Sequence, residues 1–150
     1  MSVPRTKPAV LITGRSSGIG LCTAKGLATN GFQVVASARK PDDVDRLREQ
    51  HHLPAVRLDL ADPHSIQTGL QAALELTDGK LYGLFNNGAY GQPGAVEDLT
   101  WEALEAQLRT NLLGWHELTR QVIPIMRRAK AGRIIQNSSV LGFAAMPYRG

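Results

Sequence analysis

The amino-acid sequence predicts an α/β fold, in which a doubly wound parallel sheet carries helices on both faces. Short apolar runs alternate with longer amphipathic runs through the 150 residues, as strands and helices alternate in such folds. The short runs are apolar at successive positions, which is typical of strands buried on both faces. A glycine-rich turn joins the first apolar run to the first amphipathic run, as in the first strand–helix connection of this fold.

Five apolar runs are expected to form the strands of this sheet. They are residues 9–12, 33–37, 55–58, 81–85 and 134–136. Helical segments separate these strands, and right-handed crossovers would make neighbouring strands parallel. Doubly wound sheets usually have more strands than five, and the sequence stops soon after the fifth. We therefore expect a sheet truncated after its fifth strand.

Caps and helix breakers mark the helices. The first helix is expected at 19–30, where a glycine stops it. Asp42 or Asp43 opens a second, polar helix. Asp62 caps a third helix, with Pro63 in its first position.

The longest helix is expected at 100–128. Its apolar side chains recur with helical spacing, which predicts one buried face. This face consists of Leu104, Leu108, Asn111, Trp115, Leu118 and Val122. Asn111 is the polar member, and a buried amide must find hydrogen-bond partners. Either neighbouring backbone groups satisfy it, or it has a functional role.

The composition is that of an ordinary globular protein, with 43% hydrophobic and 20% charged residues, so we expect one domain over 1–150. No apolar run is long enough for a membrane span or a signal peptide, and we expect a cytoplasmic protein without a membrane partner. The net charge is +4, but four cations (Arg127, Arg128, Lys130 and Arg133) lie near one helix end, where they complement its dipole. No nucleic-acid partner is therefore predicted. Scattered histidines and one cysteine, Cys22, predict no metal site, and Cys22 is expected to be a buried helix residue.

The most specific motif is the turn between the first strand and the first helix. After Thr13 it reads Gly14, Arg15, Ser16, Ser17, Gly18, Ile19 and Gly20. Gly14 permits a tight turn, Gly18 lets the backbone approach a phosphate, and Gly20 lets the helix pack closely on the sheet. The helix N-terminus supplies free N–H groups and a positive dipole end for a pyrophosphate. We therefore assign the whole turn to the binding of a dinucleotide.

The Gly-x-x-x-Gly-x-Gly spacing of this turn resembles the signature TGxxxGxG of the short-chain dehydrogenase/reductase family. The resemblance continues in order from Val10 to Gly142. It implies a Rossmann-type sheet and an oxidoreductase that transfers hydride between a nicotinamide cofactor and a small carbonyl or alcohol substrate. It also implies a homo-oligomer for the full-length protein.

The end of the second strand indicates which dinucleotide is bound. NAD-binding proteins of this fold place an acid there for the ribose 2′-hydroxyl, whereas a 2′-phosphate requires a cation. Here the strand leads into Arg39 and Lys40, and no acid occurs before Asp42. Arg39 matches the position at which NADP-preferring members of the family carry arginine, and we expect Arg15, in the glycine turn, near the same phosphate. We therefore predict NADP as the cofactor, in preference to NAD.

The family resemblance assigns two further segments to the cofactor. It places Asp59 beside the adenine amino group, and we include the following residue, Leu60, in the site. After the fourth strand, the sequence Asn-Asn-Gly-Ala at 86–89 resembles the family segment NNAG, whose backbone passes near the adenine ribose. Asn87 and Gly88 are therefore assigned to the cofactor. The last two residues are exchanged here, so that either the methyl group at position 89 crowds the cofactor or the turn shifts.

The resemblance assigns Ser139 as the catalytic serine and Asn111 as part of a proton relay that reaches a catalytic lysine through water. The family's proton donor is a tyrosine in a YxxxK motif, which this sequence lacks. It would fall just past Gly150, and Tyr148 is too near the serine to replace it. One interpretation is the N-terminal part of an NADP-dependent oxidoreductase, inactive by itself. The alternative is a non-enzymatic nucleotide-binding module that is complete at this length.

Overall fold

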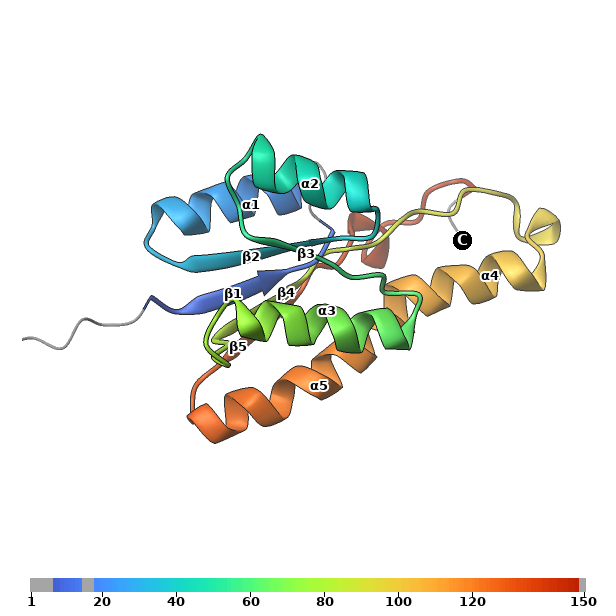
Figure 1. The fold of residues 1–150 in the computed structure, drawn as a ribbon. Coiled ribbons are helices and arrows are strands. Elements are labelled where there is room, and N and C mark those ends of the chain that lie inside the picture. Colours follow the sequence, from blue (N-terminus) through green and yellow to red (C-terminus); the bar gives the residue numbers. More distant parts are fainter. Residues whose placement is uncertain (1–6, 15–17, 149–150) are drawn as a thin grey trace, which may run out of the picture.

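The computed structural model describes residues 7–14 and 18–148, and within them five strands form one parallel sheet of order β3-β2-β1-β4-β5 (Figure 1). The strands are β1 (Ala9–Ile12), β2 (Gln33–Ala38), β3 (Ala55–Arg57), β4 (Gly83–Asn86) and β5 (Arg133–Gln136). All five lie at or within two residues of the predicted runs. The order reverses between β1 and β4, which is the switch point of a Rossmann-type sheet. The predicted fold class is confirmed.

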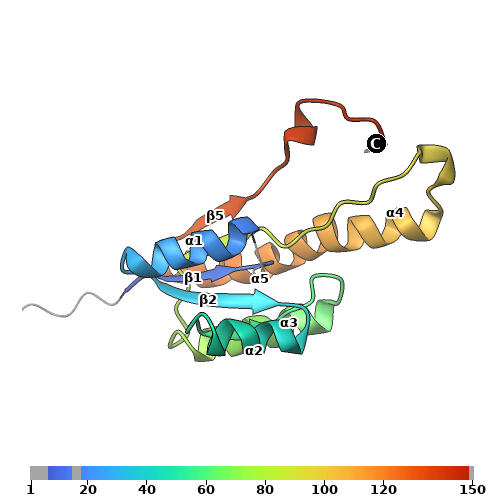
Figure 2. The same ribbon diagram turned by 90° about the horizontal axis from the view of Figure 1, so that it is seen from above.

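Helices cover both faces of the sheet, α1 and α2 on one side and α3 and α5 on the other (Figures 1 and 2). The helices are α1 (Gly18–Thr29), α2 (Pro41–Glu49), α3 (Pro63–Glu75), α4 (Trp101–Leu108) and α5 (Gly114–Ala129). Three short helical turns accompany them, η1 (Val96–Asp98), η2 (Arg109–Leu113) and η3 (Val140–Gly142). The predicted cap of α3 is confirmed, because the Asp62 carboxylate accepts a hydrogen bond of 2.9 Å from the His64 N–H.

Alternating strand residues divide the core between the two faces. Leu11, Val35 and Leu84 point toward α3 and α5, where Leu118 and Val122 meet them without solvent exposure. A second set of strand residues packs against α1 and α2. The sheet is therefore buried on both faces along β1, β2 and β4, and its carboxyl edge is fixed in position by both helical layers.

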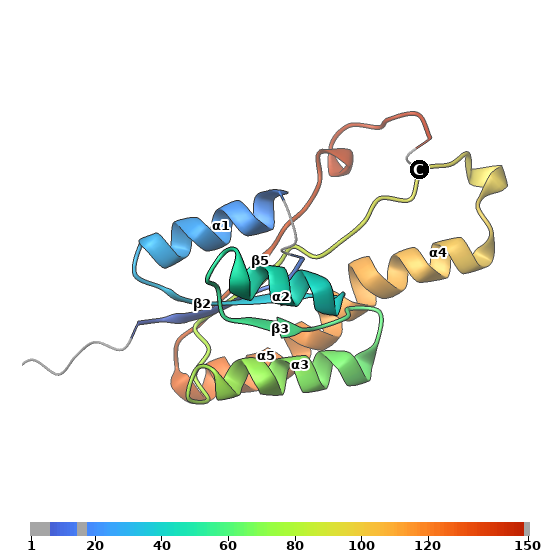
Figure 3. The same ribbon diagram turned by 45° about the horizontal axis from the view of Figure 1, so that its top comes forward.

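The predicted buried stripe of the long helix is only half correct. Leu118 and Val122 are buried, but Leu104 is 53% exposed and Leu108 is 43% exposed. The helix is divided by the π-helical turn η2, and α4 projects beyond the sheet, so that no described element covers its apolar face (Figure 3). Helical spacing identifies the apolar face correctly, but the elements that cover it are set by the topology.

Two further burial predictions are wrong. Cys22 is exposed, because it lies on the side of α1 that faces away from the sheet. β5 is an edge strand, and Ile135 is 58% exposed on it because no described helix covers that part of the sheet.

Candidate functional site

Five of the predicted cofactor residues come together at the carboxyl ends of β1, β2, β3 and β4, around the point where the strand order reverses. Open α/β sheets bind ligands at this position because the loops that leave neighbouring strands diverge there. The site is built from the loop after β1, the ends of β2 and β3, and the loop after β4.

A buried threonine joins the two central loops. The Thr13 side chain, at the end of β1, has 1% of its surface exposed. Its hydroxyl oxygen accepts hydrogen bonds from the N–H groups of Asn87 (3.0 Å) and Gly88 (2.9 Å). The side-chain amide of Asn87 in turn donates hydrogen bonds to the backbone carbonyls of Thr13 (3.2 Å) and Gly14 (2.9 Å). The loop after β1 therefore has a fixed position relative to the loop after β4.

Two glycines meet between these loops without side chains. Gly14 has a φ of +66°, and a Cβ atom there would lie 2.2 Å from the Gly88 Cα. A Cβ atom at Gly88 would lie 2.9 Å from a methyl carbon of Leu60 and 3.0 Å from the Gly14 nitrogen. Only glycine at position 14 satisfies both the left-handed backbone and the close approach.

The structure describes three further residues of the glycine turn, Gly18, Ile19 and Gly20. Gly18 has a φ of +60°, and no described atom lies within 4 Å of the place where its Cβ would be. Gly20 is buried at the start of α1, whereas the Ile19 side chain is exposed. Arg15, Ser16 and Ser17 lie outside the described residues. No described residue therefore fills the space beside Gly18 at the start of α1, where the prediction places a ligand phosphate.

A cavity of about 500 Å³ opens next to this turn. Five predicted cofactor residues line it: Gly14, Arg39, Asp59, Leu60 and Gly88. Lys40, Asp43, Ala89, Tyr90 and Thr110 are among the others. Its size fits the adenosine half of a dinucleotide, and ligand cavities commonly have this volume.

The end of β2 is positively charged. Arg39 and Lys40 are exposed at the cavity, and among the described residues the Arg39 side chain has no hydrogen bond or ion pair. Asp43 also lines the cavity, but its carboxylate pairs with Arg46 one turn further along α2. Because this acid already has a cationic partner, it opposes an incoming anion less than a free carboxylate would.

Asp59 and Leu60 follow β3. One carboxylate oxygen of Asp59 accepts a hydrogen bond from the Ala61 N–H (3.0 Å), and the other has no partner among the described residues. The Asp59 N–H donates to the Ser65 hydroxyl at 3.0 Å, which fixes the backbone of the turn. The second oxygen is therefore available as an acceptor for an adenine amino group.

Two side chains of the long helix fix the loop after β4. The Trp115 indole N–H donates to the Gly88 carbonyl at 2.7 Å. The Asn111 amide accepts from the Tyr90 N–H (3.1 Å) and donates to the Tyr90 carbonyl (2.7 Å). Neighbouring backbone thus satisfies Asn111, which is partly exposed on η2 rather than buried as predicted. Its side chain orients the cavity wall.

Ser139 lies on the other side of the switch point, beyond the end of β5. It is exposed, and its hydroxyl oxygen accepts a hydrogen bond from the Leu141 N–H (3.2 Å) at the start of η3. Two residues before it, the Asn137 amide donates to the Asn87 side-chain oxygen at 2.9 Å. The segment that carries Ser139 is therefore attached to the loop that contacts Gly14, although Ser139 does not line the cavity.

Sequence reasoning missed three of these side chains as parts of the site. Thr13, Trp115 and Asn137 hold the loops together by hydrogen bonds across long sequence separations, up to 75 residues between Thr13 and Gly88. A signal existed only for Thr13, because a threonine directly before a turn glycine at a strand end can bond the neighbouring loop. Tyr148, left without a role, is an exposed loop residue whose carbonyl accepts from the Gly94 N–H.

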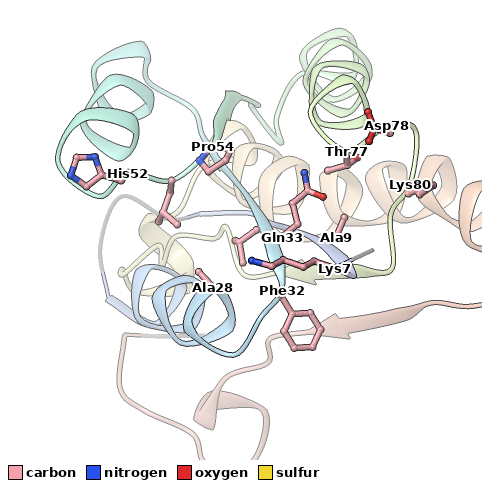
Figure 4. A pocket seen from close by; sticks show the side chains of 12 residues that line it. Lys7, Ala9, Ala28, Phe32, Gln33, His52, Pro54, Thr77, Asp78 and Lys80 are labelled. Atoms are coloured by element: carbon pink, nitrogen blue, oxygen red, sulfur yellow. The ribbon is translucent and has the colours of Figure 1, made fainter. Parts of the chain in front are cut away.

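A second cavity, of about 480 Å³, lies at the opposite, amino edge of the sheet (Figure 4). Lys7, Phe32, Gln33, His52 and Lys80 are among its lining residues. None of the predicted site residues reaches it. The cavity beside the glycine turn is therefore the candidate site.

The described residues show neither a metal-binding group of side chains nor a helix that could cross a membrane. Within 7–14 and 18–148, no three His, Cys, Asp or Glu residues form a group that could hold a metal ion. No helix in the described part of the chain has the length and apolar character needed to cross a bilayer.

Comparisons with known proteins agree with the fold. The family model for short chain dehydrogenase matches residues 8–149. The uncharacterized oxidoreductase YbbO of Escherichia coli (strain K12) is 42% identical over 142 residues, which cover 95% of this chain and 52% of that protein. The 3-ketodihydrosphingosine reductase of Bacteroides thetaiotaomicron is 33% identical over 142 residues, which cover 94% of this chain and 50% of that protein.

Solved structures give the same result. A short-chain dehydrogenase from Streptomyces avermitilis superposes with a TM-score of 0.85 at 28% identity, over 97% of this chain and 54% of that one. An actinorhodin polyketide ketoreductase with NADPH gives a TM-score of 0.86 at 28% identity, over 95% of this chain and 57% of that one. The chain spans about half the length of the curated relatives that it matches. With the glycine turn, the strand order and the family match in agreement, the chain belongs to the short-chain dehydrogenase family.

Proposed function

We propose that this chain is the cofactor-binding part of an NADP-dependent oxidoreductase that acts on a small carbonyl or alcohol. The observation that carries the choice of NADP is the end of β2, where Arg39 and Lys40 face the cavity and the one lining acid of α2, Asp43, is paired with Arg46. A 2′-phosphate at this position would meet cations and would not meet an unpaired carboxylate.

The residues present fit a dinucleotide. Gly14 and Gly88 lie in contact at the edge of a cavity of about 500 Å³. Neither has a side chain, so a ligand there would meet their backbone groups directly. The carboxylate of Asp59 keeps one oxygen without a partner in the described residues, and it suits an amino group rather than a phosphate. The turn at 14–20 would hold the pyrophosphate, and Arg39 the 2′-phosphate. When bound, NADP would supply or accept the hydride.

The remaining assigned residues act on the substrate side. Ser139 is exposed, and its hydroxyl oxygen already accepts from the Leu141 N–H, so its own proton remains free to bind a substrate oxygen. Such a donor stabilises negative charge that develops on that oxygen. Asn111 holds the Tyr90 backbone and thereby orients the wall between the cofactor cavity and the long helix. The acid–base step requires a further group, which we expect in the full-length protein.

The test is a titration of NADP and NAD into the purified full-length protein by calorimetry, for the wild type and for Arg39→Asp. We expect NADP to bind more tightly than NAD. Arg39→Asp should weaken NADP binding at least tenfold and NAD binding little, because it replaces a phosphate partner by a repelling charge. Unchanged affinities for both would refute the role of Arg39.

Activity distinguishes the oxidoreductase from the alternative, a nucleotide-binding module without catalysis. NADPH oxidation is followed at the nicotinamide absorbance with a panel of aldehydes and ketones. We expect turnover that falls in Ser139→Ala while NADPH affinity is retained. Cofactor binding without turnover of any carbonyl or alcohol, in either direction, would favour the module.

A further inference from the structure

The exposed cation at the end of β3, Arg57, has no assigned role, although it lies next to the predicted phosphate contact. We propose that Arg57 determines specificity for the 2′-phosphate, both because it holds the main chain of Arg39 and because it adds a second guanidinium beside it. This inference rests on the proposed NADP function and extends it to a residue on a different strand.

The geometry connects the two arginines directly. In the parallel pairing of β2 and β3, Ala38 lies opposite Arg57. The Leu58 N–H donates to the Ala38 carbonyl at 3.0 Å, and the Arg57 Nε–H donates to the Arg39 carbonyl at 3.3 Å. The carbonyls of two consecutive residues at the end of β2 thus accept hydrogen bonds from residues at the end of β3. The position of Arg39 depends on Arg57 as well as on its own strand.

The end of β3 is closely packed against α3. α3 approaches it closely at Gly69, where a Cβ atom would lie 2.5 Å from the Arg57 carbonyl oxygen. Side chains alternate along a strand, so Arg57 shares its face with Ala55, which packs in one cluster with Val44 and Leu47 of α2. Arg57 therefore lies on the α2 side of the sheet, the side to which the chain turns after Arg39.

The chemistry of the side chain suits a phosphate. A guanidinium has five N–H donors, and within the described residues Arg57 uses one, on the Arg39 carbonyl. No described acid pairs with it, and the side chain is exposed. Its planar fork matches the oxygens of a phosphate in a way that lysine does not. The remaining donors are available to a dianion at the end of β2.

The test compares 2′,5′-ADP with 5′-AMP, which differ by the 2′-phosphate alone, in calorimetric titrations of the full-length protein. Arg57→Ala should weaken 2′,5′-ADP binding about tenfold, because a charge-assisted contact is lost, and 5′-AMP binding less than about twofold. Arg57→Lys should bind 2′,5′-ADP with an affinity between those of the wild type and Arg57→Ala, since lysine keeps the charge but lacks the planar guanidinium. Arg128→Ala, which removes the same charge at the exposed end of α5, is the matched control and should bind like the wild type.

Several outcomes would overturn the inference. If Arg57→Ala and Arg57→Lys both weaken the two nucleotides equally, Arg57 only supports the fold. If neither variant changes 2′,5′-ADP binding while Arg39→Asp abolishes the preference for it, the NADP assignment stands and the role of Arg57 is wrong. If the wild type does not distinguish 2′,5′-ADP from 5′-AMP, the proposed NADP preference fails, and the Arg57 inference fails with it. Circular dichroism checks that each variant is folded.

Discussion

Replacing Gly14 by alanine tests the contact between the two central loops, and Gly18→Ala is its matched control. Both glycines have a positive φ, +66° and +60°, so each substitution costs about 1–2 kcal/mol for a left-handed backbone with a Cβ. At Gly14 the new Cβ would also lie 2.2 Å from the Gly88 Cα, whereas at Gly18 no described atom lies within 4 Å. Overpacking of this kind adds about 1–3 kcal/mol, since the opposing atoms are backbone.

The expected loss of unfolding free energy is therefore about 2–5 kcal/mol for Gly14→Ala and about 1–2 kcal/mol for Gly18→Ala. Native domains have about 5–15 kcal/mol in total, so the first variant should be severely weakened. The measurement is urea denaturation of the full-length protein without cofactor, followed by far-UV circular dichroism. Equal losses in the two variants would refute the reasoning, because the close approach at Gly88 would then contribute nothing.

Three further predictions concern the cofactor turn and the long helix. Gly18→Val should abolish dinucleotide binding in a calorimetric titration, since a branched side chain would occupy the place of the phosphates. The far-UV circular dichroism spectrum should stay near that of the wild type. Retained binding would show that this turn does not hold the pyrophosphate. Trp115→Phe should cost about 1 kcal/mol in urea denaturation and weaken NADP binding, because the Gly88 carbonyl loses its donor; unchanged stability and affinity would contradict this role. Hydrogen bonds from Arg120 and Gln121 lower the pKa of Glu117 to about 2, so this acid should contribute its small stabilisation above pH 4.5 and lose it as the pH falls toward 2. The stability of the wild type should therefore fall more steeply than that of Glu117→Gln between pH 4.5 and 2, and equally steep losses in the two proteins would argue against this contribution.

The sequence predicted those parts of the fold that depend on local signals. Burial of consecutive residues at 9–12 and the Asp62 cap at the start of α3 are local, and both are confirmed. The glycine turn at 14–20 and the Asn-Asn-Gly-Ala segment at 86–89 each follow a central strand, so the sequence placed Gly14 and Gly88 at the same edge of the sheet. Residues at the ends of neighbouring parallel strands come together at one edge of the sheet, and this is why five of the residues that line the cavity could be predicted.

What could not be predicted depends on partners far away in the sequence. The exposure of Leu104 follows from the projection of α4 past the sheet, which the apolar spacing of the helix does not reveal. The hydrogen bonds between the Asn111 side chain and the Tyr90 backbone depend on the path of a loop that lies 21 residues earlier in the sequence. The bond from Arg57 to Arg39 depends on strand register, which is fixed only when β2 and β3 pair. In each case a side chain's neighbours are determined by tertiary structure.

The exchange of glycine and alanine after Asn87 has an evolutionary consequence. An alanine at position 88 would meet a methyl carbon of Leu60 at 2.9 Å, and this atom is the end of a flexible side chain. A shorter residue at position 60 would vacate that space, and the Gly14 nitrogen, 3.0 Å away, would then have to yield by only a few tenths of an ångström. We therefore expect positions 60 and 88 to be a compensating pair, since a shorter residue at 60 would make alanine at 88 easier to accommodate. Gly14 has no such compensating partner, because what opposes its Cβ is the main chain.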